Sequence, residues 1–432
     1  MACRTTMVLG AAALGCAALP ATADPLGNAT ADDPIELTLY YPIAVGGALE
    51  NVMDDIIAGF EDEHPHIAVE AVYSGNYDET MVQAQSAISA GDPPATTVLG
   101  GPDMYDLIAE ELIVPFDDVV ETEAEREWLD SFYDAFMDNS RDAGGRTWGI
   151  PFQRSTVVQY WNKEAFEAAG LDPDQAPQSW DELREIAAAV QDGSDADWGV
   201  QIPSTGFAYW LFQALAIQND AELWDDAGVE THFDQDAAVE ALAFWRALAD
   251  DGTHPPGTVD WGTTPEDFLQ GETAMIWTTT GNLGNIRENA EFEFGVDILP
   301  ANARRGSPTG GGNFYLFAEA PEAERRAAMQ LIRYMTDPQP AARWSIETGY
   351  VAPTPEAWET EAMRDHVAEF PQAVAARDQL EHTVRPLGTF ARAQVQDALS
   401  NAVQAVLTGE AEPATALAEA QAEADAILAP YR

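Results

Sequence analysis

Short apolar strands alternate with helical patterns in the first part of the chain, and this alternation constrains the fold more than any other feature. Residues 35–41 and 67–73 have the composition of strands, and residues 96–99 form a third, buried run. The segments between them, 47–60 and 77–90, carry apolar residues at helical spacing. A β-α-β-α-β order predicts a parallel sheet flanked by helices. We therefore expect an α/β protein.

Two short segments follow the second and third strands and should lie at one edge of the sheet. Tyr77 comes after the second strand in a Gly-Asn-Tyr turn, and Gly100 with Gly101 comes after the third. The carboxyl ends of parallel strands meet at one edge, which is where such sheets bind ligands. We therefore expect these residues on one rim of a binding site.

The chain is long enough for more than one core and is strongly acidic. Its 432 residues, 46% of them hydrophobic, predict two or three globular units that need neither metals nor disulfides. Asp and Glu number 74 against 20 Lys and Arg, which gives a formal charge of −54. Such a surface disfavours nucleic acid and anionic membranes as partners. We interpret the acidity as an adaptation to strong brine, where charge repulsion is screened within about 3 Å at about 1 M salt.

The first 23 residues have the pattern of a secretory signal. A basic residue precedes an apolar run that ends at Ala18, and small residues precede a cleavage point after Ala23. Cleavage would remove Cys3 and Cys16, the two cysteines of the chain. In an alternative, Cys16 carries the lipid anchor of an extracellular form. The signal predicts a protein of the periplasm, with residues 24–34 as a flexible tether.

A loop that enters a strand, residues 147–163, predicts a crossing between two lobes. Pro151 precedes a β-rich run at 156–161. Arg154 and Ser155 can present a guanidinium and a hydroxyl together, which suits an anionic or polyol ligand. The alternative is a surface arginine beside a strand.

Two later segments, 276–282 and 310–315, are expected to cross between the lobes as well. In the first of them, Thr279 and Thr280 precede a predicted helix, an arrangement that favours an anion at the helix N-terminus. The alternative is a threonine that caps the helix and binds no ligand. Because the chain crosses several times, neither lobe is contiguous, and lobes joined by a hinge enclose ligands.

After the first crossing the sequence predicts mostly helices. Strands are expected at 198–202, 274–278 and 294–299. Phe207 and Trp210 lie in an aromatic-rich segment, and such density is more typical of a core than of a ligand platform. The predicted helices lie at 122–137, 180–191, 207–218, 237–251, 322–335, 341–345, 355–364, 391–407 and 413–428.

The sequence lacks the motifs of catalysis and of metal binding. It contains no nucleophile elbow, P-loop or HExxH motif, and chance explains the adjacent carboxylates among so many acids. His64 and His66 flank a proline without an acidic partner, so we predict loop residues rather than metal ligands. We expect a protein that is not an enzyme and has no cofactor.

Several segments together resemble the family 1 extracellular solute-binding proteins of ABC importers, and within that family the members that bind sn-glycerol-3-phosphate. The resemblance covers nearly the whole mature chain. It is carried by SGNYDE at 74–79, IPFQRSTVVQYWNKEAFEAAGLDPDQAP at 150–177, SWDEL at 179–183, GETAMIWTTTGNLGNIRE at 271–288, FGVDILP at 294–300, GGGNFY at 310–315 and TGYVAPT at 348–354.

The resemblance implies a two-lobed periplasmic-binding-protein fold of type II, in which each lobe is a mainly parallel sheet flanked by helices and a hinge of crossing strands joins the lobes. The N-terminal lobe would comprise 35–149 and 281–311, and the C-terminal lobe 150–280 and 312–432. Such a protein, a monomer, would capture sn-glycerol-3-phosphate or a glycerophosphodiester by hinge closure and deliver it to the membrane subunits of an ABC permease. A neutral mono- or oligosaccharide is the alternative ligand.

The resemblance also implies which residues contact the ligand. Tyr77, Phe207 and Trp210 match positions that hold the glycerol, whereas Gly101 stands where those proteins have a glutamate. Loss of that glutamate removes an acceptor and should open space for a longer ligand. The phosphate side would be formed by Ser155, Thr280 or Thr279, Gly311 or Gly312, Tyr350 and Arg385, with Arg154 or Arg392 as alternatives to the last. With Ser155 as the contact from the first crossing, Arg154 is expected to be a charge on the rim.

Overall fold

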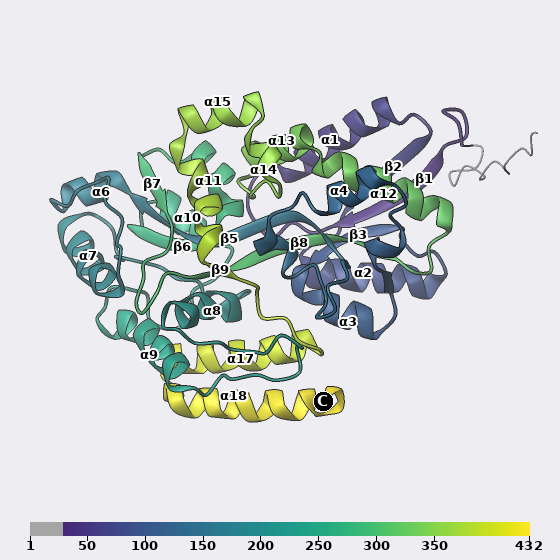
Figure 1. Ribbon diagram of the computed structural model, residues 1–432. Helices are drawn as coiled ribbons and strands as arrows, with labels where there is room; N and C mark the ends of the chain where they lie inside the picture. Colours follow the sequence, from purple (N-terminus) through teal and green to yellow (C-terminus); the bar gives the residue numbers. More distant parts are fainter. Residues whose placement is uncertain (1–28) are drawn as a thin grey trace, which may run out of the picture.

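The computed structural model describes residues 29–432, and its first part is a parallel sheet between helices (Figure 1). β1 lies between β2 and β3 and pairs with both in parallel, as the alternation of elements predicts. The predicted signal peptide, 1–23, with Cys3 and Cys16, lies outside the described residues. The strands are β1 (Ile35–Tyr41), β2 (Ile67–Tyr73), β3 (Thr96–Gly100), β4 (Ile113–Val114), β5 (Ile150–Asn162), β6 (Met275–Thr279), β7 (Phe294–Asp297), β8 (Ser307–Phe317) and β9 (Thr383–Val384).

Two long strands join the two lobes. Residues 150–156 of β5 pair with β8, whereas residues 157–162 pair with β6 and β7. These pairings are antiparallel, as is the pairing of β8 with β3. The continuous sheet therefore has the order β2-β1-β3-β8-β5-β6. We call the part around β1, β2 and β3 the first lobe and the part around β6 and β7 the second lobe; they lie on the right and left of Figure 1.

Helices cover both faces of each lobe, which confirms the predicted two-lobed α/β fold. α1 and α12 lie on one face of the sheet in the first lobe, and α2 and α3 lie on the other. In the second lobe, α8, α9, α17 and α18 lie below the strands in Figure 1. The helices are α1 (Leu49–Glu63), α2 (Tyr77–Ala90), α3 (Met104–Ala109), α4 (Glu123–Leu129), α5 (Asp134–Met137), α6 (Lys163–Ala168), α7 (Trp180–Gly193), α8 (Ala208–Gln218), α9 (Asp236–Asp250), α10 (Thr264–Leu269), α11 (Leu283–Asn289), α12 (Glu322–Thr336), α13 (Pro338–Thr348), α14 (Pro355–Trp358), α15 (Glu361–Glu369), α16 (Ala375–Asp378), α17 (Arg392–Leu407) and α18 (Pro413–Leu428).

Alternating side chains of the crossing strands divide the interior into separate cores. Phe314 of β8 packs in the core that contains α1 and α12, whereas Tyr315 packs on the opposite face with α3. In β5, Val157 faces the core of α8 and α17, and Val158 faces the core of α10 and α11. Successive residues of a strand point to opposite faces, so strands buried on both faces are apolar throughout. The lobe boundaries expected from the sequence stay a prediction, because shared packing does not define a hinge.

The predicted helix at 122–137 is wrong, because the chain forms two shorter helices there. α4 ends at Leu129 and α5 begins at Asp134. Between them Tyr133 has ψ 131°, and its N–H donates to the carbonyl of Pro353 at 3.0 Å. A distant partner therefore takes the backbone donor that a continuous helix would use.

The predicted strand at 198–202 is also wrong, since the segment forms only isolated bridges with the chain around β6. The N–H groups of Gly199 and Val200 both donate to the carbonyl of Thr253, at 3.0 and 3.1 Å. This turn toward another segment interrupts the ladder. Within residues 29–432, none of the helices has the length and apolar character needed to cross a membrane.

Candidate ligand-binding site

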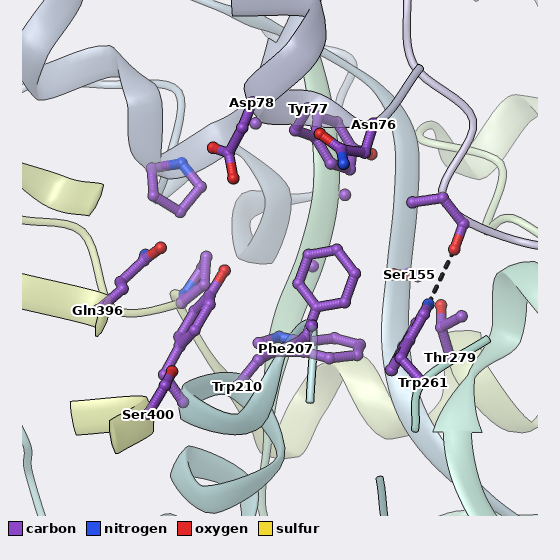
Figure 2. Close-up of a pocket in the computed structure, with 18 of the residues that line it drawn as sticks. Asn76, Tyr77, Asp78, Ser155, Phe207, Trp210, Trp261, Thr279, Gln396 and Ser400 are labelled. Atoms are coloured by element: carbon purple, nitrogen blue, oxygen red, sulfur yellow. Dashed lines mark hydrogen bonds between the residues drawn. The ribbon is translucent and has the colours of Figure 1, made fainter. Parts of the chain in front are cut away.

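A cavity of about 460 Å³ lies between the two lobes, at the carboxyl ends of β2 and β3 (Figure 2). This is the edge of the sheet at which the alternation of elements predicted a site. Its volume lies within the range of about 300–1,000 Å³ that is typical of small-molecule sites. The side chains considered below come from α2, η1 (Gly101–Asp103), β5, β6, α8 and α17, and from the loops around Trp261 and Tyr350.

The turn after β2 presents Tyr77 to the cavity. Asn76 caps α2, because its side chain accepts from the N–H of Glu79 and the Glu79 carboxylate accepts from the N–H of Asn76. The Tyr77 hydroxyl donates to Gln153 Oε1 at 3.2 Å, and Gln153 Nε2 in turn donates to the carbonyl of Pro42. Burial raises the pKa of Tyr77 well above its usual value. The side chain is therefore a neutral, oriented phenol.

Glycines of β8 allow the crossing strands to approach one another and the aromatic wall. A Cβ at Gly311, whose φ is +91°, would lie 1.6 Å from the carbonyl oxygen of Gln153. A Cβ at Gly310 would lie 2.4 Å from the ring of Trp210 and 3.1 Å from Ser155 Oγ. The Trp210 indole also donates to the carbonyl of Thr309 at 3.0 Å. Because these glycines have no side chains, the Trp210 ring and the Ser155 hydroxyl can pack directly against the backbone of β8.

Three aromatic residues form one wall of the cavity, seen at the bottom of Figure 2. The rings of Phe207 and Trp261 meet edge to face with centroids 4.8 Å apart, and Trp210 lies 6.2 Å from Trp261. The Trp261 indole donates to the carbonyl of Ala44 at 2.9 Å, the bond drawn as a dashed line. Because Ala44 follows β1, this wall of the second lobe is tied to the first lobe.

Arg392 lines the cavity and joins two carboxylates. Its Nε lies 2.5 Å from Asp103 Oδ1, and its Nη2 lies 2.8 Å from Asp78 Oδ1. Nη1 donates to Gln396 Oε1 at 3.0 Å. Burial opposes the charge of Arg392, but Asp103, Tyr209 and Asp78 outweigh it and raise the pKa of the guanidinium above its usual value. Arg392 is therefore a fixed cation of the site.

Asp103 is a buried carboxylate in the lining of the cavity. The residue is buried, and its Oδ2 forms no hydrogen bond with any residue of the 29–432 range. Burial raises the pKa of Asp103 to about 6, partly offset by Arg392. A buried acceptor without a partner is costly, so this oxygen is a strained part of the site.

The structure brings most of the predicted site residues together around this cavity. Those that line it are Tyr77, Ser155, Phe207, Trp210, Thr279, Gly311 and Tyr350. Those that lie outside the lining are Gly101, Thr280, Gly312 and Arg385. The Thr279 hydroxyl also accepts from the N–H of Gly281 at 3.1 Å and so caps the following turn. Thr279 therefore both caps this turn and lines the cavity.

The space expected at Gly101 is filled, which corrects the sequence-based interpretation. A Cβ at Gly101 would lie 2.9 Å from Asn139 Nδ2 and 3.1 Å from Arg154 Nη1. The next acid along the chain, Asp103, reaches the cavity instead. A carboxylate therefore lines the cavity two residues after Gly101.

Arg154 is not the rim charge that the sequence predicted. Its side chain is 0% exposed, lies over the ring of Phe136 and donates to Gly311 O, Asn313 Oδ1 and Thr309 Oγ1 at 3.3–3.4 Å. Burial lowers its pKa to about 10. The strand that carries it is buried on both faces, and this burial depends on tertiary packing rather than on residue type.

Arg385 lies over the ring of Trp224, with its guanidinium carbon 4.1 Å from the ring centroid, and pairs with Asp226. Arg392, the alternative named above, lines the cavity. Asp103 and Trp261 were missed by sequence reasoning. Trp261 lies in a loop rich in Gly and Pro, and an aromatic residue in such a loop is a sequence signal for a functional role. The sequence contains no such signal for Asp103, because its burial depends on distant segments.

The two histidines considered as metal ligands lie in an aromatic cluster. His64 stacks on Phe60 with centroids 4.6 Å apart and lies 6.0 Å from His66. Within residues 29–432 there is no group of three or more His, Cys, Asp or Glu side chains arranged to hold a metal ion.

Comparisons with known proteins agree with this architecture. The family model described as bacterial extracellular solute-binding protein matches residues 55–372. The chain is 27% identical over 399 residues to the sn-glycerol-3-phosphate-binding periplasmic protein UgpB of Pectobacterium atrosepticum, covering 88% of this chain and 89% of that protein.

Solved structures show the same fold. UgpB of Mycobacterium tuberculosis in complex with glycerophosphocholine has a TM-score of 0.81 at 24% identity, covering 92% of this chain and 99% of that one. The cyclic alpha-maltosyl-1,6-maltose binding protein of Arthrobacter globiformis has a TM-score of 0.77 at 20% identity, covering 91% and 99%. The family consists of substrate-binding proteins of ABC importers rather than enzymes. This chain belongs to the family of bacterial extracellular solute-binding proteins.

Proposed function

We propose that this protein captures a glycerophosphodiester, or sn-glycerol-3-phosphate, and delivers it to the membrane subunits of an ABC permease. The observation that carries the proposal is the combination of a fixed guanidinium, Arg392, with the buried carboxylate of Asp103 in one cavity. A guanidinium is suited to phosphate oxygens, and a carboxylate accepts from the hydroxyls of glycerol. The similarity to UgpB supports the same ligand class.

Hydroxyl groups on the crossing strands would complete the phosphate site. Ser155, Thr279 and Tyr350 all line the cavity, and Tyr350 lies next to Gly281. Burial raises the pKa of Tyr350, so its phenol stays a donor. Hydroxyl donors of this kind can bind phosphate oxygens without adding charge.

The charge of the lining favours a diester with a positive head group over a phosphate monoester. Arg392 is the only Lys or Arg among the lining residues, which also include Asp78, Asp103, Asp260 and Asp397. A phosphate monoester carries about −1.5 to −2 charges at neutral pH, whereas glycerophosphocholine has one phosphate charge and one ammonium. Aromatic rings also attract a quaternary ammonium. The wall of Phe207, Trp210 and Trp261 is suited to that group.

A neutral oligosaccharide is the second candidate ligand. The same aromatic wall can stack on the faces of sugar rings. The structural similarity to the maltosyl-maltose binding protein is consistent with this alternative, although it establishes the fold alone. A sugar would leave Arg392 with its carboxylate partners and no anion.

Capture would occur by closure of the lobes. Tyr77 and Asp103 belong to the first lobe, whereas Trp210 and Trp261 belong to the second. Contacts made by both lobes exist only in the closed form, so a ligand shifts the population toward closure. In this proposal β5 and β8 form the hinge, the predicted signal directs the chain to the periplasm, and the permease binds the closed form.

Calorimetric titration of the mature protein at high salt tests the proposal. We expect binding of glycerophosphocholine and of sn-glycerol-3-phosphate, and none of maltose or trehalose. Arg392→Ala should weaken the phosphate ligands by about 1.5–3 kcal/mol, the scale of a hydrogen bond to a charged group. Arg385→Ala is the matched control and should leave the affinity unchanged. Tight maltose binding without phosphate-ligand binding would overturn the proposal.

A further inference from the structure

Helix α17, which carries Arg392 in its first turn, begins without a capping side chain of its own. The preceding residue, Ala391, has a left-handed backbone with φ 49° and ψ 41°. Alanine rarely adopts this conformation, and the first amides of a helix need acceptors. Something outside the helix must therefore hold its start.

Asp106 of α3 supplies the acceptors from the other lobe. Its Oδ1 accepts from the N–H of Ala391 at 2.8 Å and its Oδ2 accepts from the N–H of Arg392 at 3.1 Å. α3 packs in the core with Leu99 and Tyr315, whereas α17 packs in the core with α8 and α18. The cap therefore spans the two lobes, and a carboxylate is the preferred charge at a helix N-terminus.

We infer that Asp106 is a positioning residue: it caps α17 across the cleft and thereby places the Arg392 guanidinium in the cavity. The backbone of Arg392 is held by Asp106, and its side chain is held by Asp78 and Asp103, which also belong to the first lobe. The guanidinium thus reaches its place only when the lobes are closed. The inference rests on the proposed function in that Arg392 is taken to bind the ligand.

Other contacts next to this cap also join the two lobes. The Tyr105 hydroxyl donates to the carbonyl of Asp226 at 3.4 Å, and the Tyr105 ring meets Phe390 edge to face with centroids 5.6 Å apart. Burial raises the pKa of Asp106, opposed by the two backbone amides and by Arg392. Both lobes thus contribute polar and apolar contacts beside the cap.

A double-mutant cycle with glycerophosphocholine as the probe tests the inference. Asp106→Ala should weaken binding about 10-fold, and Asp106→Asn should weaken it less because one acceptor remains. In an Arg392→Ala background the same Asp106→Ala change should have almost no further effect, since residues that act through one another are not additive. Asp142→Ala is the matched control, because Asp142 Oδ1 likewise accepts from two amides, of Gly144 and Arg146, on an exposed turn.

Wild-type affinity in Asp106→Ala, or an equal loss in both backgrounds, would overturn the inference. If Asp106→Ala does not fold, Asp106→Asn carries the same cycle. If the wild-type protein binds no phosphate ligand, the proposed function fails, but amide hydrogen exchange still tests the cap. Faster exchange at residues 391 and 392 in Asp106→Asn would support it, and unchanged exchange would overturn it.

Discussion

At the scale of single residues, the site contains carboxylates that are buried, although an ionised carboxylate is more stable in water. Asp103 is buried with one oxygen facing Arg392 and the other free of any described partner. Burial is the main cause of its raised pKa, Arg392 opposes it, and Asp78 and Asp106 add to it. The pKa of about 6 places the change of charge near neutral pH, where it can affect ligand binding.

Affinity for glycerophosphocholine should therefore rise with pH. A hydroxyl donates to the ionised form of Asp103, so binding should strengthen from about pH 5 to about pH 7 and change little above that. The phosphodiester does not titrate in this window, so the protein is the source of the effect. The pH dependence of the unliganded protein's stability has the opposite sign. Because the Asp103 pKa is higher in the folded protein than in the unfolded chain, the contribution of Asp103 to the free energy of unfolding falls as the pH rises through about 6.

Calorimetry across this pH range is the measurement, with Asp103→Asn as the comparison. The variant keeps a side-chain acceptor and cannot ionise, so its affinity should not vary with pH. A slope that persists in the variant would assign the titration to Asp106 or another group instead.

At the scale of elements, the strands β5 and β8 hold the site together because they contribute to both lobes. Their close approach depends on glycine: the left-handed Gly311 lies where a side chain would meet the backbone oxygen of Gln153. Bulges and glycines in strands commonly mark such close approach. The same pairing places Ser155 opposite Gly310 at the cavity.

Gly311→Ala should therefore destabilise the protein far more than a left-handed glycine substitution in open surroundings. Gly170 provides the control, with φ +73° and nothing within 4 Å of an added Cβ. Gly170→Ala should cost about 1 kcal/mol for backbone strain alone, and Gly311→Ala more than about 3 kcal/mol. Urea unfolding measures both. Equal costs would show that the β5–β8 contact tolerates a side chain.

At the scale of the whole molecule, the dominant feature is the net charge of −54. Most ion pairs among the described residues have an exposed partner, as in the pairs of Arg146 with Asp118 and of Arg184 with Asp251. Such pairs contribute little and are screened by salt. Repulsion among the remaining acids should then dominate at low ionic strength, which is the basis of the proposed adaptation to brine.

The melting temperature should rise between about 0.01 M and about 1 M NaCl, as the screening length falls from about 30 Å to about 3 Å. Thermal unfolding followed by circular dichroism would measure this, with sucrose at equal osmolality to separate screening from solvent exclusion. A melting temperature that stays high at low salt would remove the basis of the brine adaptation.

The sequence by itself determined the β-α-β-α-β order of the first lobe and the edge of the sheet at which the cavity lies. Alternating strands and helices are local patterns, and the rule that parallel sheets bind ligands at their carboxyl ends then located Tyr77 correctly at the cavity. Ser155 and Trp210 also line the cavity, as the family resemblance implied.

Only the tertiary structure decided which charges the cavity contains. Arg392 lines it and Arg385 does not, Asp103 lines it and Gly101 does not, and Arg154 is buried. Burial and pairing of a charged side chain depend on segments far apart in the chain, as when Asp106 caps a helix 285 residues away. No periodic pattern in one segment carries that information, because the energy of a buried charge is set by its three-dimensional surroundings.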